Sequence, residues 1–270
     1  MTDFRTFLSA HPRIILVEIT HAQGSTPREA GTFMLVAENA IWGTIGGGQF
    51  EFMAIHNARD LLAGSGGSEG MDIPLGPEIG QCCGGRTQLR FRVMTQQLME
   101  EFGKRLNIEA ESCPEVYLFG AGHVGHALAA ALAPLPLFTT IVETRKAELS
   151  NLPPTTQARH VAMPEALVSE IRPGGAVVIL THDHALDFLI AREALARADL
   201  AYVGMIGSAT KRATFSNWLF REGGDRAMLD RLTLPIGGSA VRDKRPEVIA
   251  AMTVAEILTA LSVYRLRSSS

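Results

Sequence analysis

The chain has 270 residues and a formal net charge of −3 at pH 7, with 46% hydrophobic and 20% charged residues. This composition is that of an ordinary globular protein, and the length favours two domains or one large one. The negative balance argues against a duplex nucleic-acid binder, which normally presents a basic face. No apolar run approaches the roughly 18 residues that a membrane span needs, so we expect no membrane association.

The first residues and the cysteine count indicate the cellular compartment. The sequence MTDFRTF lacks a charged segment followed by an apolar core, so no secretory signal peptide is visible. Three cysteines, an odd number without such a signal, indicate a reducing environment. We therefore expect a cytoplasmic protein.

Residues 1–110 are predicted to form a smaller domain of mixed α and β structure. Short apolar or alternating runs predict strands, and one stretch with helical spacing predicts a helix. The predicted strands are residues 14–19, 32–37, 41–45 and 87–93, and the predicted helix is residues 50–62.

Two glycine-rich loops belong to this first domain, GSTPR at residues 24–28 and GTIGGG at residues 43–48. They are either ordinary hairpin turns or part of a binding surface for a large anionic ligand. In the second case Arg28 is a candidate contact. Gln49 and Glu51 open the helix that follows the second loop.

Adjacent cysteines, Cys82 and Cys83, lie in the sequence GQCCGGR at residues 80–86. A thiol in a glycine-rich loop oxidises readily and contributes little packing, and Arg86 favours the thiolate that binds metals and carries sulfur. The alternative is one buried cysteine beside an accidental neighbour. We favour chemistry at this pair, with Gln81 beside it, and treat Cys113 as incidental. The absence of a second cysteine pair or a spaced histidine pair argues against a closed zinc site.

Residues 111–270 alternate strands and helices, which predicts a parallel sheet with crossover helices. The fold class is therefore α/β, with a C-terminal Rossmann-like domain after the smaller α+β domain. The predicted strands are residues 116–119, 138–142, 176–180 and 200–206, and the predicted helices are residues 124–132, 187–198, 209–220 and 246–264.

The sequence GAGHVG at residues 120–125 matches G-x-G-x-x-G directly between a strand and a helix. Such glycines allow a tight turn, close approach of backbone to phosphate, and close helix–strand packing. An acid, Glu143, follows the second strand and would accept hydrogen bonds from a ribose or a pterin-like ring edge, unless it is merely solvated. The candidate contacts in this motif are Gly120, Gly122, His123 and Gly125.

Polar residues follow two further strands at the same sheet edge. His182 and His184 are structural or capping residues, pocket-lining residues, or metal ligands. Ser208 is a predicted N-cap, and Lys211 and Arg212 either bind an anion with it or form a solvated helix face. Because parallel strands end at one edge, we expect these segments to converge on one crevice.

Together these motifs, in this order, resemble the XdhC/CoxI family, accessory proteins of molybdenum hydroxylases such as xanthine dehydrogenase. The resemblance implies binding of the molybdenum cofactor (molybdopterin), its protection while a cysteine desulfurase sulfurates it, and its insertion into apo xanthine dehydrogenase. It implies that Cys82 and Cys83 contact the cofactor or its molybdenum. Glu143 departs from the family, where aspartate is frequent.

The resemblance therefore favours a chaperone without turnover, in contact with cofactor-biosynthesis proteins and compatible with a homodimer. One alternative is an NAD(P)-dependent oxidoreductase on the same Rossmann domain, for which His123, His182 and His184 are the candidate proton-transfer groups. Another is a sulfur-relay enzyme that carries a persulfide on Cys82 or Cys83.

Overall fold

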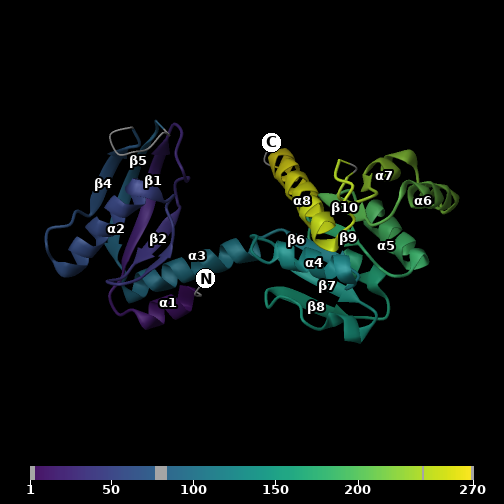
Figure 1. The fold of residues 1–270 in the computed structure, drawn as a ribbon, viewed down its shortest axis with the longest axis horizontal. Helices are drawn as coiled ribbons and strands as arrows, with labels where there is room; N and C mark the ends of the chain where they lie inside the picture. Colours follow the sequence, from purple (N-terminus) through teal and green to yellow (C-terminus); the bar gives the residue numbers. More distant parts are fainter. Residues whose placement is uncertain (1–3, 77–83, 239, 269–270) are drawn as a thin grey trace. The chain divides into compact units, whose positions relative to one another are not determined.

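The computed structural model describes residues 4–76, 84–238 and 240–268, and the chain divides into two compact units, Met1–Arg105 and Leu106–Ser270. Each unit has its own sheet and its own hydrophobic core (Figure 1). The larger, C-terminal unit contains a parallel sheet and the smaller one an antiparallel sheet, which confirms the predicted fold class.

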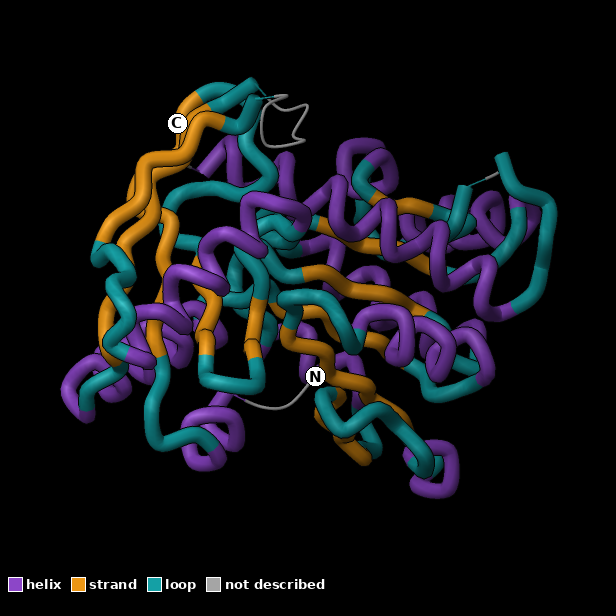
Figure 2. Tube along the Cα trace, turned by 60° about the vertical axis from the view of Figure 1, so that its left-hand side comes forward, coloured by secondary structure: helices purple, strands orange, loops and turns teal. Residues whose placement is uncertain are grey.

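The N-terminal unit is built on a five-stranded antiparallel sheet with the strand order β3-β2-β1-β5-β4. Figure 2 shows the strands of the chain in orange and the loops that join them in teal. The elements are α1 (Phe4–Ala10), β1 (Ile15–Gln23), β2 (Phe33–Val36), β3 (Ile41–Gly43), α2 (Gly48–Ala63), β4 (Gly70–Pro74), β5 (Arg86–Val93) and α3 (Gln96–Glu111).

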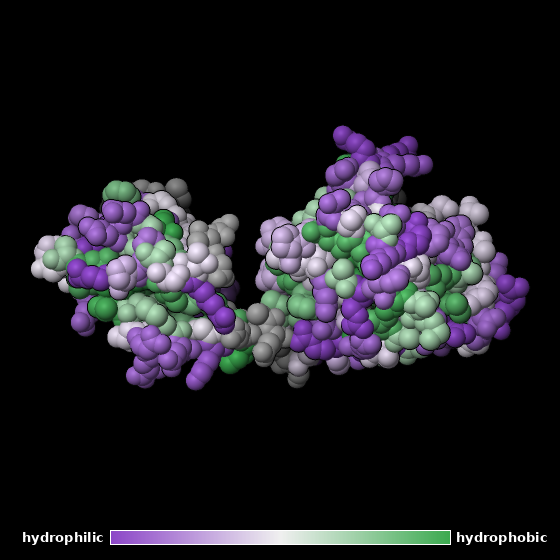
Figure 3. All heavy atoms as spheres, turned by 90° about the horizontal axis from the view of Figure 1, so that it is seen from below, coloured by the Kyte–Doolittle hydropathy of each residue, from purple (hydrophilic) through white to green (hydrophobic). Residues whose placement is uncertain are grey.

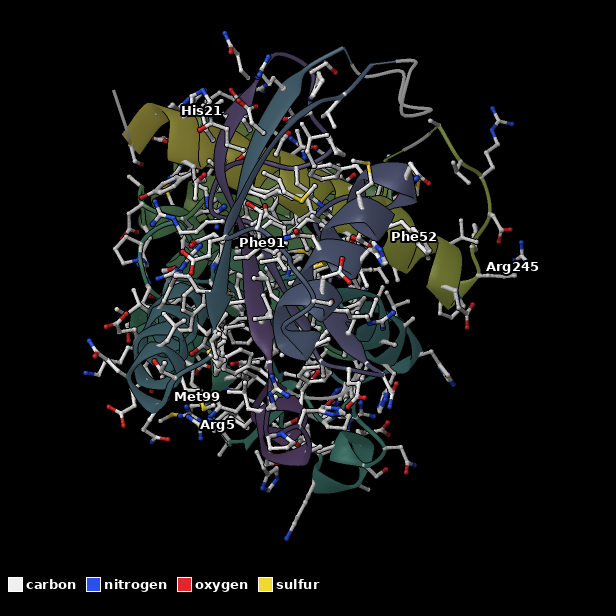
Figure 4. All side chains as sticks on the ribbon, turned by 90° about the vertical axis from the view of Figure 1, so that its left-hand side faces the viewer. Arg5, His21, Phe52, Phe91, Met99 and Arg245 are labelled. Carbon is white, nitrogen blue, oxygen red and sulfur yellow. The ribbon has the colours of Figure 1, made fainter. Side chains whose placement is uncertain are left out.

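Helix α2 covers the sheet of this unit with the face that its sequence spacing predicts. Phe50, Ala54 and Ala58 are fully buried in the core cluster, together with Phe91 of β5. The opposite face of the helix carries Phe52, whose side chain is exposed and points away from the helix body (Figure 4). Helix α2 begins at Gly48, directly at the end of the second glycine-rich loop.

The C-terminal unit is a six-stranded, fully parallel sheet with the order β11-β10-β9-β6-β7-β8. Its strands are β6 (Glu115–Phe119), β7 (Phe138–Glu143), β8 (Thr156–His160), β9 (Ala176–Ile179), β10 (Tyr202–Met205) and β11 (Leu232–Thr233). Its helices are α4 (His123–Leu132), η2 (Lys146–Leu149), η3 (Pro164–Glu170), α5 (His184–Ala196), α6 (Ala209–Arg221), α7 (Arg226–Asp230) and α8 (Pro246–Ser268).

Alternate residues of the central strands pack into two separate cores, one on each face of the sheet. In β6, Tyr117 and Phe119 face the cluster formed with η3, α5 and α6, whereas Val116 and Leu118 face the cluster formed with α4 and α8. Figure 1 shows α8, in yellow, beside α4. Because both faces of the sheet are covered, functional groups are presented at the strand ends.

Helix α8 is long and apolar enough, by length and composition alone, to cross a membrane. Within the described part of the chain, however, Ala250, Ile257 and Leu261 of this helix are buried in the core it shares with α4. Hydrophilic and hydrophobic residues are interspersed on the face that Figure 3 presents. Helix α8 is therefore a covering helix of the sheet.

Candidate functional site

The strand order places the first and fourth strands of the C-terminal unit side by side, although they are far apart in the sequence. Strand β6 pairs with β7 on one side and with β9 on the other, so the chain proceeds in opposite directions from the centre of the sheet. The loops after β6 and β9 therefore diverge at the carboxyl ends of these two adjacent strands. This is the place where ligands bind in open α/β sheets. These loops hold the glycine motif and the sequence THDH.

The three glycines of the motif lie in different structural surroundings. A Cβ atom on Gly120, whose φ is +120°, would lie 2.4 Å from the Leu180 carbonyl oxygen after β9. A Cβ atom on Gly125 would lie 2.2 Å from the carbonyl oxygen of Gly120. Gly120 and Gly125 therefore allow the loop to pack against its neighbours, as the motif predicts.

Gly122 faces open space, since a Cβ atom built there meets no heavy atom within 4 Å. It is the N-cap of α4, and no side chain caps the helix at this point. Its backbone carbonyl accepts the first helical hydrogen bond, from His126, so the N–H groups before His126 are outside the helical ladder. This end of α4 is consequently a place where an anion can approach the backbone.

The carboxylate of Glu143, at the end of β7, is buried beneath this turn. Its Oε2 accepts a hydrogen bond from the Ala121 backbone N–H at 2.9 Å. Its Oε1 accepts bonds from the backbone N–H groups of Thr144 and Arg145 at 2.9 and 3.0 Å. The Arg145 guanidinium donates to both oxygens at 3.2 Å. Glu143 therefore holds the glycine turn in place, and its acceptor positions are occupied by this chain.

These contacts govern the ionisation of Glu143. Burial by itself raises the pKa of the carboxyl, but the Arg145 guanidinium and the N–H groups of Ala121 and Arg145 outweigh it and lower the pKa to about 2. The carboxyl group therefore stays ionised well below the pH at which an ordinary glutamate takes up a proton.

An open cleft of about 970 Å³ lies against the glycine turn. Gly122, His123 and His182, three of the predicted contacts, line it together with Arg145. The side of the cleft along α4 is formed by small apolar residues, and the beginning of α8 closes another side. Residues of the cleft that the sequence reasoning did not assign are His126, Ala127, Ala130, Ala131, Glu148, Asn151, Pro153, Pro246 and Glu247.

His184 differs from His182 in its position. It is the first residue of α5 and is exposed, and it does not line the cleft. The preceding residue, Asp183, caps this helix by accepting a hydrogen bond from the Ala185 N–H at 2.8 Å. Among the described residues, no group of three or more histidine, cysteine, aspartate or glutamate side chains is placed to hold a metal ion.

Lys211 is directed into the protein rather than toward the cleft. Its ammonium group lies 2.5 Å from a carboxylate oxygen of Asp187 in α5, and it donates to the Ile206 carbonyl at 2.9 Å. Asp187 is fully buried and the Lys211 side chain is 8% exposed. This pair could not be predicted from the sequence, because an aspartate in a first helical turn is ordinarily explained by the helix dipole.

Ser208 caps α6, as predicted, by accepting a hydrogen bond from the Lys211 backbone N–H at 3.3 Å. The neighbouring Arg212 donates to the carbonyl oxygens of Leu232 and Leu234 at 3.0 and 3.3 Å. Its guanidinium thus holds the last strand of the sheet. Neither Ser208 nor Arg212 lines the cleft.

In the N-terminal unit the two glycine-rich loops lie against each other. A Cβ atom on Gly46 would lie 2.7 Å from the Pro27 ring, and one on Gly85 would lie 2.3 Å from the Ser25 carbonyl oxygen. The residues directly after the cysteine pair therefore lie beside the first loop. Gln81, Cys82 and Cys83 themselves are outside the described residues. Arg28, which closes the first loop, is exposed.

Glu51 occupies the backbone N–H groups of the second glycine loop. One of its oxygens accepts hydrogen bonds from the Thr44 hydroxyl, the Ile45 N–H at 2.9 Å and the Gly47 N–H at 3.1 Å. Burial raises the pKa of Glu51, but these hydrogen bonds outweigh it and keep the pKa below its ordinary value. The Glu51 carboxylate therefore holds this loop in place, as the Glu143 carboxylate holds the glycine turn after β6.

Comparisons with known proteins agree with this architecture. Residues 116–257 match the family model of the XdhC Rossmann domain, and residues 7–70 match that of the XdhC and CoxI family. The uncharacterized protein YqeB of Escherichia coli K12 is 29% identical over 260 residues, covering 90% of this chain and 42% of YqeB. This chain thus spans less than half the length of that relative.

Among solved structures, a Bacillus halodurans protein described as a xanthine dehydrogenase has a similar fold. The TM-score is 0.76 at 17% sequence identity, and the match covers 93% of this chain and 92% of the other. At this identity the similarity concerns the fold.

Proposed function

The chain belongs to the XdhC and CoxI family, and from this premise we propose that it is a chaperone of the molybdenum cofactor. In this proposal it binds molybdopterin, protects it while the terminal sulfido ligand is added, and inserts it into apo xanthine dehydrogenase. Family membership supports the accessory role. The chaperone itself needs reversible binding and a partner surface, but no turnover.

The open backbone at Gly122 carries the proposal for the C-terminal unit. Molybdopterin has a phosphate group, and a phosphate fits a helix N-terminus where no Cβ atom stands in the way. The adjoining cleft of about 970 Å³ has the volume of a small-molecule site, and Ala127, Ala130 and Ala131 offer an apolar surface to a flat ring system. His123 and His182, which also line the cleft, would supply polar contacts.

In the N-terminal unit, Cys82 and Cys83 are the proposed contacts to molybdenum or to its sulfur, because thiolates are soft ligands. Gly46 and Gly85 let the neighbouring backbone loops lie close together, and Gly84 and Gly85 directly follow the pair in the sequence. A cysteine desulfurase would supply the sulfur, and cofactor-biosynthesis proteins would supply the cofactor. We also propose that the protein works in the cytoplasm, as a homodimer.

A second candidate is an NAD(P)-dependent oxidoreductase, which is favoured by a strand order typical of dinucleotide-binding Rossmann folds. Such a site uses the acid after the second strand to bind the ribose. In this chain the corresponding carboxylate, Glu143, already accepts hydrogen bonds from Ala121, Thr144 and Arg145. The chaperone is therefore the better-supported function.

Cys82→Ser and Cys83→Ser test the proposal directly. We expect at least one of them to reduce cofactor retention and activation of apo xanthine dehydrogenase by about tenfold or more, since serine lacks a soft sulfur donor. The measurement is cofactor transfer to purified apo-dehydrogenase, with and without a cysteine desulfurase. Cys113→Ser is the matched control and should transfer cofactor like the unmodified chain.

The same variants separate chaperone from sulfur relay. A relay loses activation only when the desulfurase must supply sulfur, whereas a binding role loses it with presulfurated cofactor as well. Unchanged cofactor stoichiometry and unchanged activation in both single variants would refute the role of the cysteine pair.

A further inference from the structure

The buried pair of Asp187 and Lys211 adjoins the cleft without lining it. Asp187 lies in the first turn of α5 and is fully buried. One of its oxygens is 3.0 Å from the Thr181 backbone nitrogen and 2.7 Å from the Thr181 hydroxyl. Thr181 is the residue directly before His182, which lines the cleft.

The other oxygen of Asp187 faces the Lys211 ammonium group, and Lys211 also donates to the Ile206 carbonyl at the end of β10. The pair therefore connects the loops that follow two neighbouring strands. A charge this deeply buried is stable only while its partner is present. The Lys211 ammonium group therefore donates to the Asp187 carboxylate and to the Ile206 carbonyl, both within the protein.

His182 is consequently held on both sides. The residue before it, Thr181, is fixed by Asp187, and the Thr181 hydroxyl accepts a bond from the Asp183 N–H at 3.2 Å. Asp183, the residue after it, is in turn fixed as the N-cap of α5. The backbone can therefore adopt few alternative directions at His182.

We propose that Asp187 and Lys211 are positioning residues of the ligand cleft, which set the direction of the His182 side chain through Thr181. They fix the backbone on which His182 is presented and make no contact with the ligand themselves. The inference rests on the proposed function in one respect, namely that the cleft is where the cofactor binds.

Two double variants test the proposal without leaving a buried charge unpaired. Asp187→Leu with Lys211→Met removes both charges and the hydrogen bonds to Thr181. Asp187→Asn with Lys211→Met removes both charges but keeps an oxygen that accepts from Thr181. Both are expected to fold, because replacing a whole buried ion pair is tolerated far better than removing one partner. Asp230→Asn, in the exposed pair with Arg226, is the control for loss of a paired aspartate.

The first measurement is the NMR signal of the His182 imidazole in the full chain, assigned by its loss in His182→Gln. The signal should keep its position in the Asn/Met variant and the control, and should shift and broaden in the Leu/Met variant. An unchanged signal in a folded Leu/Met variant would overturn the proposal. If that variant does not fold, Asp187→Ala with Lys211→Met decides instead. It removes the same hydrogen bonds to the Thr181 N–H and hydroxyl with a smaller side chain, so an unchanged His182 signal there has the same meaning.

The second measurement is molybdopterin affinity. His182→Gln should weaken binding by about tenfold in the unmodified chain and by less than about twofold in the Leu/Met variant, in which His182 is no longer held in place. Equal losses in the two backgrounds would show that the pair is merely structural. If molybdopterin does not bind the unmodified chain at all, the proposed function fails, while the NMR result still decides the positioning role.

Discussion

Gly120→Ala is expected to destabilise the C-terminal unit by at least about 3 kcal/mol, whereas Gly122→Ala, two residues along, leaves its stability within about 1 kcal/mol. The new Cβ atom at Gly120 would lie 2.4 Å from a backbone oxygen of Leu180, and the φ of +120° is strained for any residue with a side chain. At Gly122 the added methyl group meets nothing within 4 Å.

Gly122→Ala is expected to affect cofactor binding rather than stability. The methyl group of Gly122→Ala occupies the space through which a phosphate reaches the N-terminus of α4, so this variant should fold normally and lose cofactor binding. Urea denaturation and cofactor retention measure the two effects. A Gly120→Ala variant as stable as the unmodified chain would contradict the packing role, and full cofactor retention by Gly122→Ala would contradict the phosphate position.

Glu143→Gln is expected to destabilise the protein by about 2–3 kcal/mol at pH 7 and to remove part of its acid sensitivity. The folded-state pKa of about 2 is below the ordinary value of 4.5, so ionised Glu143 stabilises the fold above pH 4.5. This stabilisation is lost as the pH falls from 4.5 toward 2. Because Arg145 is 42% exposed, solvent screens its pair with Glu143, and the free energy of stabilisation is smaller than the change in pKa alone would give.

The measurement is the free energy of unfolding by urea between pH 2 and pH 7. The difference between the unmodified chain and Glu143→Gln should shrink as the pH falls through that range. Asp243→Asn is the control, because Asp243 pairs with Arg245 on the surface, where the arginine side chain points into solvent (Figure 4). A difference that is independent of pH would refute the buried carboxylate as the cause.

Much of the C-terminal unit could be predicted because its central strands are buried on both faces and carry unbroken apolar runs. Two edge strands of the chain, β8 and β4, could not be predicted in this way. Strand β8, with the sequence TQARH, is half exposed and polar, and β4 carries glycine and proline. Such strands are recognised by their pairing with a neighbour, which a local pattern does not contain.

Part of the candidate site could likewise be predicted from the sequence, and part of it could not. The meeting of Gly122 with His182 follows from the rule that parallel strands end at one edge, and the structure places both on one cleft. The directions of Lys211 and Glu143 depend on which buried partner each one finds, and Asp187 is 24 residues from Lys211 in the sequence. The packing of α5 against α6 determines the direction of Lys211, and the turn after β6 determines that of Glu143. A local sequence pattern contains neither contact.

Cofactor content tests the central proposal most directly. The full chain is produced in a host that makes molybdopterin, purified without added ligand and oxidised, and the fluorescent pterin product is measured per mole of protein. We predict pterin in near-stoichiometric amount for the unmodified chain and much less for Gly122→Ala and for the affected cysteine variant. A folded chain that releases no pterin and instead binds NADPH saturably would contradict the chaperone function and favour the oxidoreductase.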